Sequence, residues 1–160
     1  MTAAIVEGWA PVYPHLRYEA PEEAIAWLSR VFGFQERVRL SRPDGAVIVA
    51  KLETPGGGLV MVAGSSREFN QWIQERVPSF REQREQPWPN LSHSITVLVS
   101  NVDAHYEQAK AGGATMLMPP ADQPWGLRSY AAIDVEGHQW EFSQVVYIVQ
   151  PEAWGATRTG

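Results

Sequence analysis

Residues 134–142, DVEGHQWEF, decide the fold that we predict for this chain. The stretch is typical of a turn that closes at Gly137 and leads into a strand. Side chains alternate along a strand, so Trp140 and Phe142 share one face while Glu141 lies on the other with Gln139 and Ser143. The apolar face needs cover by a helix, whereas the mixed face with the acid either lines a ligand-binding site or faces solvent.

An altered copy of this stretch occurs 80 residues earlier, as TPGGGLVMV at residues 54–62. Gly57 then falls on Gly137, and Met61 falls on Glu141. At the front of each half, residues 15–28 match residues 96–109 at a shift of 81, which places Tyr13 on Ser94. The sequence therefore predicts an internal repeat over about residues 11–147.

Each half has the same order of expected elements: strand, helix, strand, strand, strand. In the first half these are residues 11–18, a helix that starts at Pro21 and stops at Gly33, and strands at 35–40, 46–52 and 59–63. In the second half they are 92–99, a helix at 102–111 with Ser100 and Asp103 as its capping pair, and strands at 115–118, 127–133 and 138–148, with a loop at 119–126. We predict an α+β fold with two tandem βαβββ modules. The expected divisions are 1–64, a linker at 65–90, 91–150 and a tail at 151–160.

The linker is long, charged and marked by prolines, which favours a solvated connection with a helical turn or two. The alternative is a lid over a binding site that uses Phe69, Trp72 and Phe80.

Composition excludes several classes of function. The formal charge of −5 argues against nucleic acid as a partner, because phosphate binding needs a basic face. The chain has no cysteine, so thiolate metal sites and cysteine nucleophiles are absent. No apolar run reaches the ~20 residues of a membrane helix, and the start does not read as a signal peptide. We expect a cytoplasmic protein that does not bind a membrane.

Three stretches resemble a known family: AIAWLSRVFGF at 24–34, SNVDAHYEQAKAGGA at 100–114 and QPWGLRSYAAIDVEGHQWEFSQ at 123–144. They are similar to the vicinal oxygen chelate (VOC) superfamily of glyoxalases, bleomycin-resistance proteins and ring-cleaving dioxygenases. The resemblance implies that the two modules combine into one open, cup-shaped, eight-stranded barrel with a ligand site inside. It also implies a homodimer, and the seven tryptophans provide apolar area that such a contact would bury.

In metal-using members of that superfamily, four ligands line the cup, and they carry over to Tyr13, Met61, Ser94 and Glu141. Only Glu141 keeps the family's ligand type. One carboxylate with a phenol, a hydroxyl and a thioether is a poor set for a divalent ion, so we expect no metal and no other cofactor. A metal site made by His15, His93 and Glu141 stays open as an alternative, whereas His105 is expected to be solvated on its helix.

The expected ligand-binding residues are Tyr13, His15, Met61, Ser94, Thr96, Trp125 and Glu141. Trp125 could stack on a planar ligand, cover the core or contact a second subunit, and Arg128 could pair with an anionic ligand or with Glu141. The favoured function is binding of a small aromatic or hydrophobic molecule, as in the bleomycin-resistance relatives that confer antibiotic resistance. One alternative is an enzyme, either a metal-dependent lyase, isomerase or dioxygenase, or a metal-free one with Glu141 as its base. A regulatory or scaffold role without a ligand also stays open.

Overall fold

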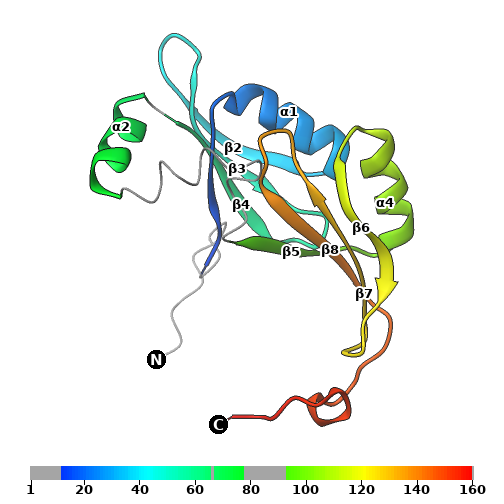
Figure 1. The fold of residues 1–160 in the computed structure, drawn as a ribbon. Coiled ribbons are helices and arrows are strands. Elements are labelled where there is room, and N and C mark those ends of the chain that lie inside the picture. Colours follow the sequence, from blue (N-terminus) through cyan, green and yellow to red (C-terminus); the bar gives the residue numbers. More distant parts are fainter. Residues whose placement is uncertain (1–11, 66, 78–92, 160) are drawn as a thin grey trace.

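The structure is a computed structural model of the 160-residue chain, and it describes residues 12–65, 67–77 and 93–159. Within these ranges no helix is long and apolar enough to span a membrane. The first module consists of β1 (His15–Tyr18), α1 (Pro21–Phe32), β2 (Gln35–Ser41), β3 (Val47–Glu53) and β4 (Leu59–Gly64) (Figure 1). Its four strands form a sheet in the order β1-β4-β3-β2, and β1 runs parallel to β4.

The second module repeats this order. It consists of β5 (Ser94–Leu98), α4 (Val102–Ala111), β6 (Thr115–Asp122), β7 (Leu127–Ile133) and β8 (Gln139–Val145), in a sheet of order β5-β8-β7-β6. Between the modules lies α2 (Arg67–Arg76), which stands apart from the other two helices in Figure 1, and a short 3-10 helix, η1 (Pro151–Trp154), follows in the tail. The two βαβββ modules are thus confirmed. Over the described ranges the two sheets remain separate, and no closed eight-stranded barrel is formed.

The two turns that were aligned in the sequence repeat, at Gly57 and Gly137, have the same backbone structure. Gly57 and Gly137 both have positive φ angles, of 80° and 93°, which glycine adopts without steric cost. In each turn the backbone N–H of the glycine donates to the carbonyl three residues earlier, that of Thr54 or Asp134. The pairing of TPGGG with DVEGH therefore holds at the level of individual hydrogen bonds.

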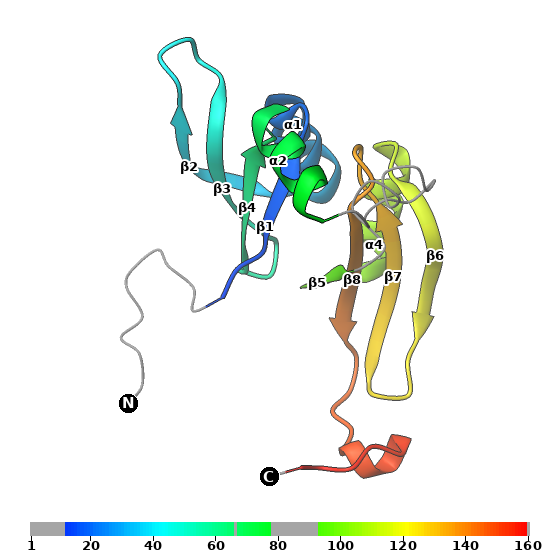
Figure 2. The same ribbon diagram turned by 60° about the vertical axis from the view of Figure 1, so that its left-hand side comes forward.

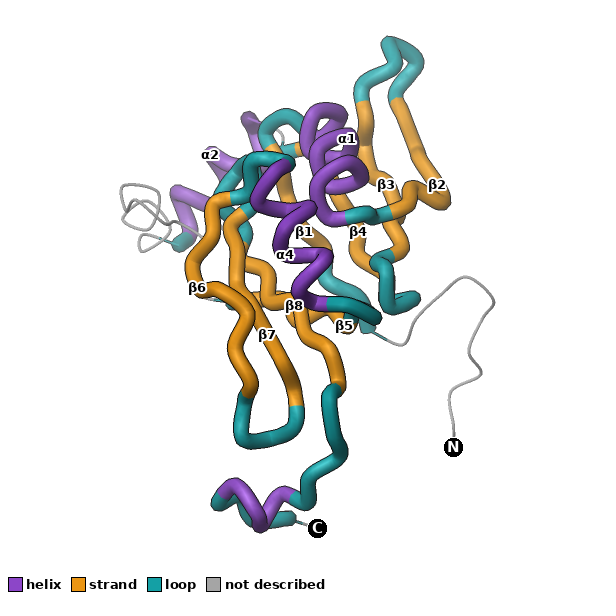
Figure 3. Tube along the Cα trace, turned by 90° about the vertical axis from the view of Figure 1, so that its right-hand side faces the viewer, coloured by secondary structure: helices purple, strands orange, loops and turns teal. Residues whose placement is uncertain are grey.

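Helices α1 and α4 pack against each other and lie on the same side of the two sheets (Figure 3). The side chains on this side form one core that is shared by both modules. Phe32 from α1 contacts Phe142 with ring centroids 4.7 Å apart, and Phe34 contacts Trp140 at 5.1 Å. Trp140 and Phe142 are fully buried there, which confirms the alternation expected for β8.

Figure 2 shows the two sheets as separate layers, and residues near the ends of their strands also join the modules. The ring of Tyr18, at the end of β1, lies 4.5 Å from that of His138, just before β8. At the other end of this junction, a Cβ on Gly56 would come within 2.4 Å of the carbonyl oxygen of Leu98. Only a residue without a side chain fits at Gly56.

Several local expectations were wrong. Residues 119–122, expected in a loop, continue β6, where two register shifts against β7 accommodate Pro119 and Pro120 on an edge strand that needs no donor on its open side. The cap of α4 is Asn101, whose side chain accepts a hydrogen bond from the N–H of Ala104. Strands β1 and β8 are shorter than expected, because β1 begins at His15 and β8 ends at Val145.

Candidate functional site

We call the face of each sheet that points away from α1 and α4 its far face. Strand pairing arranges the far face of the second sheet in rows of four side chains. The central row is Thr96, Glu141, Ala131 and Met118, one residue from each strand. The row on one side is Ser94, Gln139, Ile133 and Thr115, and the row on the other side is Leu98, Ser143, Ser129 and Ala121. Glu141 therefore lies within a mixed polar and apolar surface.

The burial of these side chains differs between the middle and the margins. Ala131, Ser129 and Ser143 are buried, and Glu141 is partly buried. The longer side chains at the margins, Leu98 and Met118, are each 51% exposed. The carboxylate thus lies among small, recessed groups with exposed apolar side chains around them.

A chain of hydrogen bonds leads to Glu141. The Ser143 hydroxyl donates to Glu141 Oε1 at 3.1 Å, and the Ser129 and Ser143 hydroxyls lie 2.8 Å apart. A serine has one hydroxyl proton, so Ser143 can only accept from Ser129 once it donates to the carboxylate. Over the described residues, the second oxygen, Oε2, has no hydrogen-bond partner.

The far face of the first sheet has the same layout but a different charge. Its central row is His15, Met61, Lys51 and Val38, and the next row is Arg17, Ala63, Val49 and Leu40. Val38 and Leu40 are exposed. Burial and the neighbouring Arg17 charge hold the pKa of His15 below its usual value, which favours the neutral imidazole. In the two rows described, the first sheet has three basic or protonatable side chains, His15, Arg17 and Lys51. The corresponding rows of the second sheet have one acid, Glu141.

The structure brings some of the expected site residues beside each other. Thr96 is paired with Glu141, and Ser94 lies in the adjacent row beside Gln139. His15 is paired with Met61, whereas Tyr13 precedes β1 and is partly buried. Tyr13, His15 and Met61 belong to the first module, and Ser94, Thr96 and Glu141 belong to the second.

The donor set does not suit a metal ion. In the residues that the structure describes, no three His, Asp or Glu side chains lie together as a possible metal site. This includes His15, His93 and Glu141, which are all described and are not brought together. The carboxylate of Glu141 is surrounded by hydroxyls and apolar groups, which bind divalent ions poorly.

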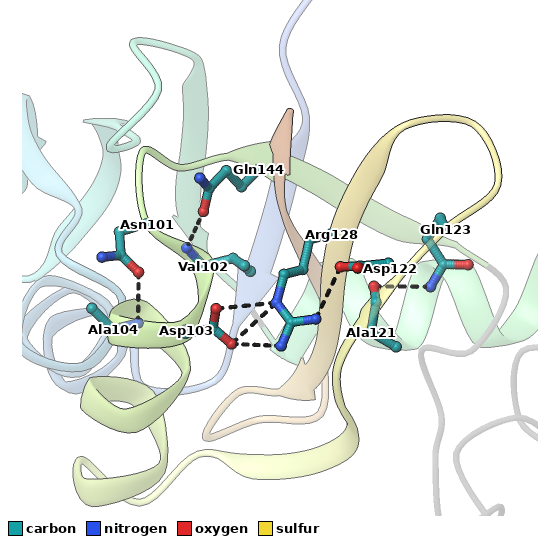
Figure 4. Close-up of polar contacts among 9 residues, drawn as sticks. All are labelled: Asn101, Val102, Asp103, Ala104, Ala121, Asp122, Gln123, Arg128 and Gln144. Atoms are coloured by element: carbon teal, nitrogen blue, oxygen red, sulfur yellow. Dashed lines mark hydrogen bonds and ion pairs between the residues drawn. The ribbon is translucent and has the colours of Figure 1, made fainter. Parts of the chain in front are cut away.

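Trp125 and Arg128 have other partners. Trp125 lies in the turn between β6 and β7, and its ring packs against that of Trp154 in the tail at 6.2 Å. Arg128 donates to Asp103 on α4 through two nitrogens and to Asp122 on β6 (Figure 4). These hydrogen bonds raise the pKa of Arg128 and lower that of Asp103. Arg128 thus neutralises two acids on the helix side of the sheet and does not pair with Glu141.

The far-face residues that were not expected at a site include Ser129, Ala131, Met118 and Lys51. Alternation along β7 would have placed Ser129 and Ala131 together on one face. Met118 could not be found in this way, because the register shift between Met116 and Met118 reverses the alternation of β6.

Comparisons with known proteins agree with this architecture. A family model described as Glyoxalase/Bleomycin resistance protein/Dioxygenase superfamily matches residues 11–142. An uncharacterized protein of Mycobacterium bovis, Mb0911c, is 29% identical over 136 residues, which are 83% of this chain and 82% of that protein.

Two solved structures show the same arrangement. TioX from Micromonospora sp. ML1 is 32% identical, with a TM-score of 0.62 over 88% of this chain and 100% of TioX. A glyoxalase/bleomycin resistance protein/dioxygenase family enzyme from Burkholderia phytofirmans PsJN is 20% identical, with a TM-score of 0.58 over 83% and 96% of the two chains. At that lower identity the likeness concerns the fold alone.

Proposed function

This chain belongs to the glyoxalase/bleomycin resistance protein/dioxygenase superfamily, and from that premise we propose that it binds a small aromatic or hydrophobic molecule without a catalytic metal. The binding site is a cup lined by the far faces of the sheets. The observation that carries the proposal is the position of Glu141. It is a lone carboxylate at a family ligand position, beside hydroxyls, recessed small residues and exposed apolar side chains.

The chemistry of this surface suits a ligand with a ring and a polar group. Sites for small molecules are mostly apolar, with a few polar groups that fix the orientation of the ligand. Leu98 and Met118 supply exposed apolar area, and Thr96 and Glu141 supply the polar groups. A metal-dependent lyase, isomerase or dioxygenase would need ligands that the described residues do not supply, so we do not favour it.

We also propose that the protein is a homodimer. Val38 and Leu40 on the first sheet are 58% and 55% exposed, and similar side chains are exposed on the second. Contiguous exposed apolar surface is typical of interfaces and binding sites. A second copy would cover part of it and deepen the cup.

The proposed site can be tested with a neutral aromatic probe, 1-naphthylmethanol, followed by ¹H–¹⁵N NMR. We expect the probe to shift the amide signals of the central row, those of Thr96, Glu141 and Met118. Met118→Ser should weaken binding about fivefold or more, because it removes apolar contact area. Val135→Ser is the matched control, since Val135 is as exposed but lies in a turn. Shifts confined to residues outside both far faces would contradict the proposal.

A further inference from the structure

We infer that the ligand group at Glu141 is a cationic nitrogen, such as a protonated amine. This deepens the proposed function and rests on it, because it specifies the chemical class of the molecule bound on the far face of the second sheet. Two features of the site indicate a cation: the directions of the hydrogen bonds around Glu141 and the charges on its sheet face.

The hydrogen-bond chain fixes the carboxylate as an acceptor. The Ser143 proton is directed to Oε1, and the Ser129 proton is then directed to Ser143. Both serines are buried, Ser129 with 4% and Ser143 with 0% of the side chain exposed, so their hydroxyls are held in a packed environment. Both protons of this chain point toward Glu141, and neither is offered to a ligand.

The other oxygen is available to a ligand. Over the described residues Glu141 Oε2 has no partner, and the side chain is only partly buried. A carboxylate accepts hydrogen bonds and donates none. The complementary group on the ligand must therefore be a donor, and an ionised donor makes the stronger hydrogen bond.

No cation of the same sheet face competes for this carboxylate. The twelve side chains in the three rows around Glu141 include no lysine or arginine. Arg128, the arginine of β7, is on the opposite face and is bound by Asp103 and Asp122. The basic groups His15, Arg17 and Lys51 lie on the far face of the other sheet, so at Glu141 itself the recessed negative charge selects a positive group over a neutral or negative one.

Three probes with one ring system and different charge test this inference. They are 1-naphthylmethylamine, which is protonated at neutral pH, neutral 1-naphthylmethanol and anionic 1-naphthoate. We expect the amine to bind about tenfold more tightly than the alcohol, and the carboxylate to bind most weakly. Isothermal titration calorimetry on the purified protein gives the three affinities, and NMR locates each probe.

Three variants test whether Glu141 is the cause of the preference for the amine over the alcohol. Glu141→Gln should bring the amine and the alcohol to within about twofold of each other, because the charge is removed and the shape is kept. Ser143→Ala should reduce the preference several-fold, because it releases the carboxylate from its fixed orientation. Glu152→Gln is the matched control, since Glu152 is a carboxylate in the tail, outside both far faces, and is paired with Arg158, and it should leave the preference unchanged.

The possible results are distinguishable. Equal affinities for the three probes, with shifts in the Glu141 row, would overturn the inference and leave the proposed function standing. A preference for the amine that survives Glu141→Gln would also overturn it. Failure of every probe to bind would contradict the proposed function and the inference together.

Discussion

Asp134 is the residue on which contacts between the modules converge. Its Oδ2 accepts from the Tyr18 hydroxyl at 2.6 Å and from Trp140 Nε1 at 3.0 Å. Its Oδ1 accepts from the backbone N–H groups of Glu136 and His138, both at 3.0 Å. One buried carboxylate thus closes the turn before β8, holds the central tryptophan of the core and binds the first module. Burial and the charge of Asp134 raise the pKa of Tyr18 well above its usual value, so Tyr18 remains a donor.

Asp134→Asn should lower the free energy of unfolding by about 2–4 kcal/mol. The new amide nitrogen is a donor, and in either orientation of the amide it would face donors: the Tyr18 hydroxyl and Trp140 Nε1, or the two backbone N–H groups. Tyr18→Phe should cost about 1–3 kcal/mol, because it removes one of the four hydrogen bonds. Urea denaturation measures both values. The cost of Tyr18→Phe should be smaller in the Asp134→Asn background, because the two residues interact directly. Fully additive effects would show that this hydrogen bond does not stabilise the junction.

The substitutions at the family ligand positions lead to a prediction about metal content. Protein purified without chelator should contain no stoichiometric zinc, nickel, iron or manganese, because Tyr13, Met61 and Ser94 are weak ligands. Elemental analysis before and after chelator treatment measures this. About one metal ion per chain, removed by chelator, would contradict the prediction.

At the scale of elements, the beginning of α1 depends on the other module. Ala20 is its N-cap and has no side chain that could accept a hydrogen bond. Glu136, in the turn before β8, accepts from the backbone N–H groups of Glu19 and Ala20 at 2.6 and 2.9 Å. Its negative charge also lies at the positive end of the helix dipole. A residue 116 positions away in sequence thus replaces the missing local cap.

Glu136→Ala should destabilise the protein by about 1 kcal/mol, the usual cost of losing a helix cap. Amide hydrogen exchange in the first turn of α1 should become faster as well. Val135→Ala, at the exposed neighbouring position, is the control and should change neither value. Equal exchange rates in the two variants would mean that Glu136 does not cap α1.

At the scale of the whole molecule, His105 links the two modules on the helix side. The neutral ring accepts from the Tyr130 hydroxyl at Nδ1, 2.6 Å away, and donates from Nε2 to the carbonyl of Phe32 at 3.1 Å. The expectation that His105 is solvated was wrong, because α4 turns this side chain toward the shared core. Burial is the main cause that lowers its pKa below the usual 6.5, and the hydrogen bond to Phe32 opposes it.

This lowered pKa makes stability depend on pH. Below about pH 6.5 the unfolded chain binds a proton at His105 that the folded protein does not, so stability should fall as the pH drops from that value toward the folded pKa. Above about pH 6.5 His105 is neutral in both states, so its contribution to the stability of the folded protein is fully present. His105→Gln should lose less stability between pH 7.5 and pH 5.5 than the wild type, as measured by urea denaturation. An identical pH dependence of the two proteins would assign the effect to other groups.

The exposed apolar side chains on both far faces lead to the prediction of a homodimer. Light scattering should give a mass of twice 17.9 kDa at micromolar concentrations. Leu40→Glu, which places a charge among these side chains, should shift the equilibrium toward monomer, whereas Val135→Glu should not. A monomeric mass at every working concentration would contradict the proposal.

The sequence by itself determined the repeated βαβββ modules and the two faces of β8. These features follow from short-range rules: glycine permits the positive φ of both turns, and alternation separates Glu141 from Trp140 and Phe142. Such rules act over a few residues, and they are visible without knowing which strands pair. The same rules placed Thr96 and Glu141 on faces that could meet.

Only the tertiary structure decided what surrounds those residues. The neighbours of Glu141 depend on the register of four strands, and the irregular pairing of β6 brings Met118 into its row. The contacts of Asp134, Glu136 and His105 join residues 25 to 117 positions apart, by side chains whose partners no local pattern specifies. The two modules repeat one backbone plan, but strand pairing puts a lone acid, Glu141, in the central row of one far face and two basic or protonatable groups, His15 and Lys51, in the central row of the other.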